Sequence, residues 1–301
     1  MKNTPTRFIA LLTLTMLFGS CIKENLADCN LNLSVELSMQ GNNCGIEPVY
    51  SSLGKVTVFA FNEAGIFQDQ FTHEHVKSGS STNFPLSLPQ GNYTLIAWAG
   101  YANTPFSVQK LVKGHTSLNE LYMPSYSLGN GNKVAAYRPI FTGIVKHVNA
   151  QDGLVQKIKL QEITKPVQVS FAGLPLGHNY QARISFNAVR YKFENSLLSL
   201  LADDHYTMAS LLYTEARNKY TTETSLLWPI VNYSPQLIIR DLDVGTDIFR
   251  ADIKAMLAQL GQVNFDCEPV IKIDLSSNQA YPTEVNILIN GWMVQYTNNE
   301  L

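Results

Sequence analysis

The chain has 301 residues, and its 22 lysines and arginines nearly balance its 24 aspartates and glutamates, which gives a formal net charge of −2 at pH 7. A nearly neutral chain without a basic cluster excludes nucleic acid as a partner, because phosphate binding needs grouped positive charge. The length predicts two domains of ordinary size or one large β domain.

The first twenty residues have the pattern of an export signal. Lys2 and Arg7 give a basic start, and residues 8–18 form an apolar stretch. This stretch is shorter than the roughly 20 residues that cross a membrane, so residues 1–20 are predicted to be a signal peptide. No later apolar run approaches that length.

A cysteine follows the signal directly. Leu17-Phe-Gly-Ser-Cys21 resembles the lipobox of bacterial lipoproteins, in which the cysteine becomes the lipidated N-terminus. We therefore expect a covalent diacylglycerol and acyl chain on Cys21, no other cofactor, and attachment to a membrane through this lipid. The alternative is an ordinary secreted protein with a free cysteine at this position.

Residues 21–28 are predicted to be a polar tether, and residues 29–163 a first β-sandwich domain. The first strand alternates polar and apolar residues, which places Leu31, Leu33, Val35 and Leu37 on one face. Two β-rich runs around the turn Asn62–Gly65 predict a hairpin. Further strands are expected at residues 84–89, 91–100, 136–148 and 154–163, and a short helical segment at 111–123.

Residues 164–301 are predicted to form a second β-sandwich domain. Apolar residues at helical spacing indicate a helix over 246–260, capped by Thr246 or Asp247 and ended by Gly261. The fold class is therefore all-β with a minor helix, in two tandem sandwiches. Its strands are expected at residues 167–171, 180–189, 206–213, 224–231, 236–240, 270–275 and 284–292.

Three cysteines remain beyond Cys21, and their odd number allows at most one intramolecular bridge. A bridge between Cys29 and Cys44 would stabilise the fold by about 3 kcal/mol in the loop-entropy description. Whether it forms is left open. Cys267 is flanked by Phe265 and Val270 and is expected to be a small buried side chain.

Catalytic motifs are absent from the sequence, which contains no G-x-S-x-G, H-E-x-x-H, P-loop or G-x-G-x-x-G pattern. His73-Glu74-His75 could place two imidazoles on one face of a strand and bind a metal. The stretch is polar and lacks a clear third ligand, so a solvated loop is favoured. The sequence predicts neither an enzyme nor a metal site.

The acidic run from Asp241 to Asp247 superficially resembles a calcium loop. An EF-hand has glycine at its sixth position and glutamate at its twelfth, where this chain has Thr246 and Asp252. A loop followed by a helix N-cap is the favoured interpretation.

The three tryptophans, Trp98, Trp228 and Trp292, allow two interpretations. Exposed indole rings could form a carbohydrate platform, whereas tryptophans more often fill sandwich cores. Solvent-exposed, coplanar rings of Trp98 or Trp292 would favour a surface glycan-binding lipoprotein, whereas burial of both would exclude it.

Several motifs along the chain together resemble one family. They are Cys21 followed by Asp28-Cys29, the stretch from Gly91-Asn-Tyr93 to Trp98-Ala-Gly100, and the stretch from Asn264 through Ile289-Asn-Gly-Trp292. The sequence resembles the FimB-type fimbrial anchor lipoproteins of Bacteroidales, of the type V fimbrial system. This resemblance implies two transthyretin-like Greek-key β-sandwich domains.

The resemblance also implies a function. Such proteins stand at the base of a surface fimbrium, hold its shaft to the outer membrane and limit its elongation. Shaft subunits in these systems are understood to join by strand addition, in which one subunit completes a neighbour's sheet. Val285, Ile287, Ile289 and Trp292 are the candidate subunit contact.

The distribution of arginine favours an anchor over a shaft or tip subunit, which is the alternative role in the same system. Shaft subunits of the best-known relatives lose their first strand through arginine-specific cleavage. No arginine lies between Arg7 and Arg138, so the first strand is expected to stay joined to Cys21.

Overall fold

The computed structural model describes most of the chain beyond residue 29. The described ranges are 30–39, 44, 53–76, 83–100, 110–123, 139–185, 190–192, 196–198, 206–228, 230, 234–278 and 284–295. The predicted signal peptide and tether, with Cys21 and Cys29, lie outside these ranges. No helix in the described ranges is long and apolar enough to cross a membrane.

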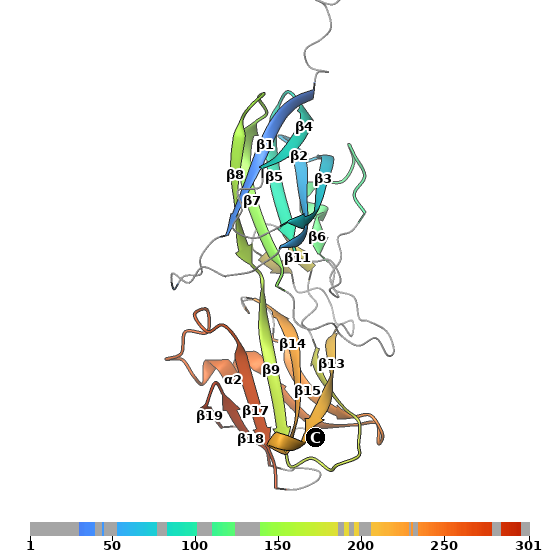
Figure 1. Cartoon of the computed structure of the whole chain (residues 1–301), viewed down its shortest axis with the longest axis vertical. Coiled ribbons are helices and arrows are strands. Elements are labelled where there is room, and N and C mark those ends of the chain that lie inside the picture. The colour runs from blue at the N-terminus through green and yellow to red at the C-terminus, as the bar shows by residue number, and fades with distance from the viewer. Residues whose placement is uncertain are drawn as a thin grey trace, which may run out of the picture.

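The chain forms two β domains that stack end to end (Figure 1). The N-terminal domain contains a seven-stranded sheet. Its strands are β1 (Asn30–Met39), β2 (Gly54–Asn62), β3 (Phe67–Val76), β4 (Asn83–Pro89), β5 (Asn92–Ala99), β7 (Phe141–Asn149) and β8 (Val155–Glu162). A short 3-10 helix, η3 (Leu118–Glu120), precedes β7.

The C-terminal domain contains a nine-stranded sheet. Its strands are β9 (Thr164–Ala172), β10 (Tyr180–Ser185), β13 (Tyr206–Thr214), β14 (Lys219–Leu227), β15 (Gln236–Asp241), β16 (Thr246–Asp252), β17 (Ile271–Ser276), β18 (Asn286–Ile289) and β19 (Trp292–Val294). The helical segments are η4 (Glu215–Arg217) and α2 (Ile253–Ala258).

The N-terminal sheet, in the order β3-β2-β5-β7-β8-β1-β4, folds into two layers. The layers join at a corner where β7 and β8 pair only through Phe141 with Glu162 and Thr142 with Gln161. In one layer β1 lies between β8, to which it is parallel, and β4, to which it is antiparallel. The first strand is thus central in its layer.

Alternation of side chains explains why these segments form a core. Leu33 and Val35 of β1 are fully buried, and β4 alternates exposed and buried residues along its length. The strand β5 is buried on both faces because Leu95 faces the space between the layers, while Trp98 packs on Phe59 beneath the segment around Leu121. The strand predicted at residues 91–100 is thus confirmed, and its two faces are both apolar.

The C-terminal domain repeats this arrangement. Its first strand, β9, is antiparallel to β14 and parallel to β17, as β1 is to β4 and β8. The corner lies within β13, whose residues up to Leu211 pair with β10 and whose residues from Leu212 pair with β14. The predicted fold class, all-β with one short helix and two β domains, is confirmed.

One predicted helix is wrong in extent. Residues 246–252 form β16, and only Ile253–Ala258 are helical, with Asp252 as the N-cap that accepts from the Ala255 amide at 2.9 Å. The neighbouring strand β15 pairs with this segment, and Phe249, Ala251 and Ile253 alternate into the core. Tertiary pairing thus overrides the helical spacing.

The predicted hairpin around Asn62–Gly65 is confirmed as β2 and β3. The predicted solvated loop at His73-Glu74-His75 is wrong, because these residues belong to β3. His73 is half-buried against Phe84, with ring centroids 4.3 Å apart, and burial lowers its pKa. Glu74 forms an ion pair with Lys55 at 3.5 Å.

Several links hold the two domains together. The short strand β6 (Tyr122–Met123) of the N-terminal half pairs with β11 (Arg190–Lys192) of the C-terminal half, and β12 (Ser196–Leu198) completes this small sheet. The Trp228 amide donates to the Ile163 carbonyl at 2.9 Å. The Ile230 side chain packs against the core clusters of both domains.

A disulfide between Cys44 and Cys267 also joins the domains, with 5.5 Å between their Cα atoms. This pairing leaves Cys44 unavailable to Cys29, a bridge that the sequence left open, and it corrects the expectation that Cys267 is a small buried side chain. The bridge connects residues 223 positions apart, and spacing along the chain gave no signal that the end of β1 and the start of β17 meet.

Lys165 is a buried charge at this junction, with only 7% of its surface exposed. Its ammonium donates to the carbonyls of Phe265 and Glu268 and lies 4.6 Å from the centre of the Trp228 ring. Burial lowers the pKa of Lys165, and the nearby carboxylates, Asp266 first among them, offset part of this effect.

We expect the Lys165→Met variant to differ from the wild type in how its stability depends on pH. Because the pKa is lower in the folded state, the unfolded state binds the proton more readily between that value and the ordinary 10.5. The free energy of unfolding of the wild type should therefore rise relative to the variant as pH increases through this window. Urea unfolding at several pH values measures the difference, with Lys272→Met, on the exposed face of β17, as the control. Parallel pH curves for wild type and Lys165→Met would contradict the assignment.

Candidate functional site

A surface pocket is lined by turns and strands of the C-terminal domain, at the end of that domain that faces away from the N-terminal domain. Its volume is about 850 Å³, and it is open to solvent. The turn between β9 and β10, the strands β13 and β14, and the turn between β15 and β16 form its walls. Two of these walls are turns, so the hydrogen bonds that fix the turns determine the shape of the pocket.

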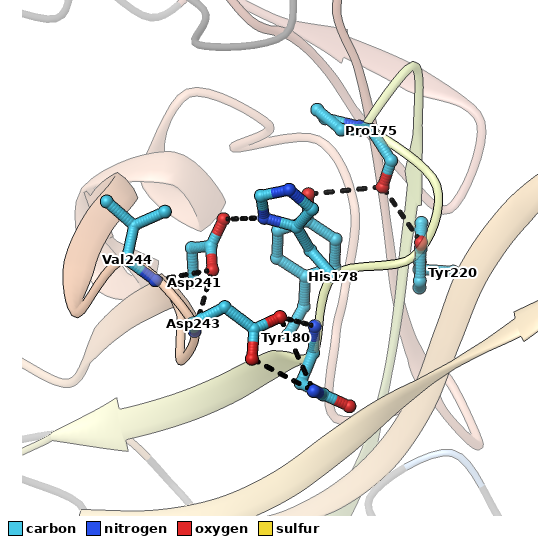
Figure 2. Close-up of polar contacts among 8 residues, drawn as sticks. Pro175, His178, Tyr180, Tyr220, Asp241, Asp243 and Val244 are labelled. Carbon is cyan, nitrogen blue, oxygen red and sulfur yellow. Dashed lines mark hydrogen bonds and ion pairs between the residues drawn. The ribbon is translucent and has the colours of Figure 1, made fainter.

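Asp241, at the end of β15, holds two of these walls together (Figure 2). Its carboxylate is fully buried. One oxygen accepts from His178 Nδ1 at 2.7 Å, and the other accepts from the backbone amides of Asp243 at 2.9 Å and Val244 at 3.2 Å. An aspartate that accepts from amides two and three residues later favours a tight turn, and Gly245, with φ of 79°, completes it.

Asp243 makes the second connection between the turns. Its carboxylate accepts from the Asn179 backbone amide at 2.8 Å and from the Asn179 side chain at 3.0 Å. These hydrogen bonds lower the pKa of Asp243. Their stabilising effect is present above the ordinary pKa of an aspartate and is lost as pH falls through the lowered value.

His178, Asp241 and Asp243 place one potential ligand atom each within 4.8 Å of one another. Every one of the four carboxylate oxygens, however, already accepts a hydrogen bond from the protein. The cluster is accounted for as a hydrogen-bond network that joins two turns. The favoured interpretation of the acidic run as a loop is therefore correct, whereas the helix N-cap is Asp252 and not Thr246 or Asp247.

Tyrosines form the floor of the pocket. The Pro175 carbonyl accepts from the hydroxyls of Tyr180 at 3.2 Å and Tyr220 at 2.9 Å. The Tyr180 and Tyr220 rings meet edge to face with centroids 4.8 Å apart, and the Tyr213 ring lies 5.2 Å from Tyr220. Burial raises the pKa of Tyr220. The floor is thus aromatic and fixed in position by backbone hydrogen bonds.

The apolar side chains around this floor are exposed to solvent. The fractional exposures are 65% for Leu176, 69% for Leu212, 37% for Tyr213 and 44% for Leu242. We call these four residues the distal apolar patch. Sequence reasoning missed it; the available signal was the presence of leucine at two turn positions, 176 and 242, that are usually polar.

The four predicted contact residues near the C-terminus fall into two groups. Ile287 and Ile289 are fully buried in the domain core because β18 lies inside the sheet, between β17 and β19. Val285 is half-buried against the same core. These three side chains pack inside the domain, so they do not form an exposed surface for a partner.

The fourth residue, Trp292, is 60% exposed, and the adjacent Met293 is 62% exposed. Both belong to β19, which ends the sheet within the part of the chain that the structure describes. Trp98, by contrast, is fully buried, and Trp228 is half-buried with its indole nitrogen donating to Asp266 at 2.6 Å. A carbohydrate platform built from all three tryptophans is therefore excluded.

Comparison with known proteins decides the family. The family described as fimbrillin-A associated anchor proteins Mfa1 and Mfa2 matches residues 26–298. The chain belongs to this family of fimbrial anchor proteins. The minor fimbrium anchoring subunit Mfa2 of Porphyromonas gingivalis is 24% identical over 306 residues, which cover 94% of this chain and 92% of the relative. The anchor family is structural, and the protein is not an enzyme.

Solved structures share the fold of this anchor-family protein. The fimbrial anchor protein Mfa2 from Porphyromonas gingivalis superposes with a TM-score of 0.65 at 21% identity, covering 88% of this chain and 99% of that one. A Bacteroides thetaiotaomicron protein whose name proposes polysaccharide binding superposes with a TM-score of 0.67 at 19% identity, covering 89% and 99%. At these identities the likeness establishes the fold alone.

Proposed function

We propose that this protein is the lipid-anchored base of a surface fimbrium and holds the fimbrial shaft to the outer membrane. Membership of the anchor protein family supports this function, and the lipobox that ends at Cys21 supports the means of attachment. Because Cys21 precedes β1 by only nine residues, the lipid holds the folded body close to the membrane.

The position of β1 is the observation that carries the proposal. This strand begins at the end of the N-terminal domain that faces away from the C-terminal domain (Figure 1). It is paired on both sides and buries Leu33 and Val35. A buried central strand keeps the lipid joined to the folded body, which suits an anchor and not a subunit that leaves the membrane with a growing shaft.

Retention of β1 also accounts for a limit on elongation. A subunit that loses its first strand offers a groove to the next subunit, whereas a sheet whose first strand is in place has no vacant position there. We propose that addition of this protein to the base of the shaft ends growth for that reason.

The shaft subunit is proposed to bind the C-terminal domain, which lies at the other end of the molecule from the start of β1. The strand β19 offers backbone groups at the sheet edge for strand addition, flanked by the exposed side chains of Trp292 and Met293. This retains Trp292 from the sequence prediction and omits the buried isoleucines.

Replacing Cys21 tests the proposed function. In cells that make the Cys21→Ala variant, we expect the protein to leave the outer membrane and the fimbriae to appear in the medium instead of on the cells. Cys29→Ala is the matched control, because Cys29 precedes β1 as Cys21 does but lacks the lipobox. Mass spectrometry of the wild-type protein should find an acylated Cys21 peptide continuous with residues 31–37. Fimbriae that stay attached in the Cys21→Ala cells, or an unlipidated N-terminus beyond residue 38, would refute the proposal.

A further inference from the structure

The disulfide occupies an unusual place in the chain. Cys44 follows β1, the first described strand, and Cys267 precedes β17, which β18 and β19 follow among the described residues. The bridge therefore closes a covalent loop that contains most of both domains, and the two cysteines are 223 positions apart. Only the two ends of the mature chain lie outside it.

The two end segments run along the length of the molecule. The strand β1 starts at the far end of the N-terminal domain and runs toward the junction (Figure 1). The strand β17 is parallel to β9, which starts at the junction with Thr164 and runs toward the far end of the C-terminal domain. The strand β1, the bridge and β17 therefore form a covalent route from one end of the molecule to the other.

We propose that the Cys44–Cys267 bridge carries the mechanical load of the fimbrium past the interior of the protein. The proposal rests on the proposed function, in which pull enters at Cys21 and leaves through the C-terminal strands. With the bridge closed, tension passes from β1 through the two sulfur atoms to β17. Residues 45–266 lie in a loop that this route bypasses, so pulling cannot extend them.

The strands on this route are held in the geometry that resists pulling. Residues Asn30 to Glu36 of β1 pair with β4, and Ser34 to Met39 pair with β8. All of β17 pairs with β9, and its residues from Ile273 to Ser276 also pair with β18. Ladder hydrogen bonds run across the strands, so force along a strand loads them together instead of opening them one at a time.

Without the bridge, the same force would act on the junction between the domains. Among the described residues, the other links there include the short β6–β11 pairing, the Trp228 to Ile163 hydrogen bond, the hydrogen bond from the Ile140 amide to the Thr164 hydroxyl and the packing of Ile230. Once these contacts gave way, the chain between the two cysteines would lengthen. The bridge thus makes the two domains one mechanical unit.

Single-molecule pulling of the full mature chain, held at its two ends, tests the load route. We expect complete unfolding of the reduced protein to give a contour longer by about 75 nm than that of the oxidised protein, from the 223-position separation at roughly 3.4 Å per residue. The Cys44→Ser/Cys267→Ser variant should match the reduced protein, and Cys29→Ser the oxidised one. Equal contour lengths for the oxidised and the reduced wild-type protein would overturn the proposal. This comparison does not depend on the folding of any variant.

Exposure of cells to increasing fluid shear tests whether the bridge keeps the fimbriae attached under load. We expect the Cys44→Ser/Cys267→Ser cells to shed their fimbriae at lower shear than wild-type or Cys29→Ser cells with equal amounts of anchor in the outer membrane. If Cys21→Ala cells shed fimbriae while the double serine variant retains them as the wild type does, the load route is refuted and the anchor function stands. If Cys21→Ala cells also retain fimbriae, the anchor function itself fails.

Discussion

A chain that begins at residue 40, and therefore lacks β1, is expected to lose its folded N-terminal domain. Burial of Leu33, Val35 and Leu37 stabilises the domain by about 1.5 to 3 kcal/mol for each side chain. The sum is comparable to the roughly 5 to 15 kcal/mol that stabilises a typical protein. Removal of β1 also unpairs both β4 and β8.

Circular dichroism and urea unfolding of the 40–301 chain measure this loss. The control is a chain that starts at Asn30, which keeps β1 but lacks the tether and should unfold like the full mature protein. A synthetic peptide of residues 30–39 should restore part of the lost structure, because it can refill the gap between β4 and β8. A 40–301 chain that unfolds cooperatively at the wild-type urea concentration would contradict the central role of β1 and favour a processed shaft subunit.

The Asp241→Ala variant is expected to be less stable by about 3 kcal/mol, because it removes a fully buried carboxylate and leaves three hydrogen-bond donors without their acceptor. Three donors are affected: the ring nitrogen of His178 and the backbone amides of Asp243 and Val244. The turns that shape the pocket should separate, so the Tyr180 and Tyr220 rings should become more exposed.

Urea unfolding and the fluorescence of the pocket tyrosines report these two effects. Asp243→Ala is the matched control, because it removes an exposed carboxylate from the same turn and leaves the buried network around Asp241 in place. It should lose much less stability. If the two variants lose equal stability, the buried network does not hold the turns as described.

The sequence allowed much of the fold to be predicted, because alternation along a strand is a local property. Leu31, Leu33, Val35 and Leu37 share a face in the sequence, and the latter three are buried in the structure. The turn Asn62–Gly65 marked its hairpin correctly. The lipobox at Cys21 is also a local pattern and needs no fold to be recognised.

The candidate site was less accessible to sequence reasoning. The run from Asp241 to Asp247 was correctly interpreted as a loop, yet its partners His178 and Asn179 lie about 60 residues earlier. The distal apolar patch combines residues from two turns and one strand that are distant in the chain. Such a surface has no sequence motif of its own.

The sequence by itself determined the all-β composition and the family resemblance and predicted the export signal, since each depends on residues close together in the chain. Only the tertiary structure decided that Cys44 bonds Cys267, that residues 246–252 form a strand, and that Ile287 and Ile289 face inward while Trp292 faces solvent. Each of these depends on which strands become neighbours. A strand's place at the centre or the edge of a sheet is set by its partners, and those partners lie far away in the chain.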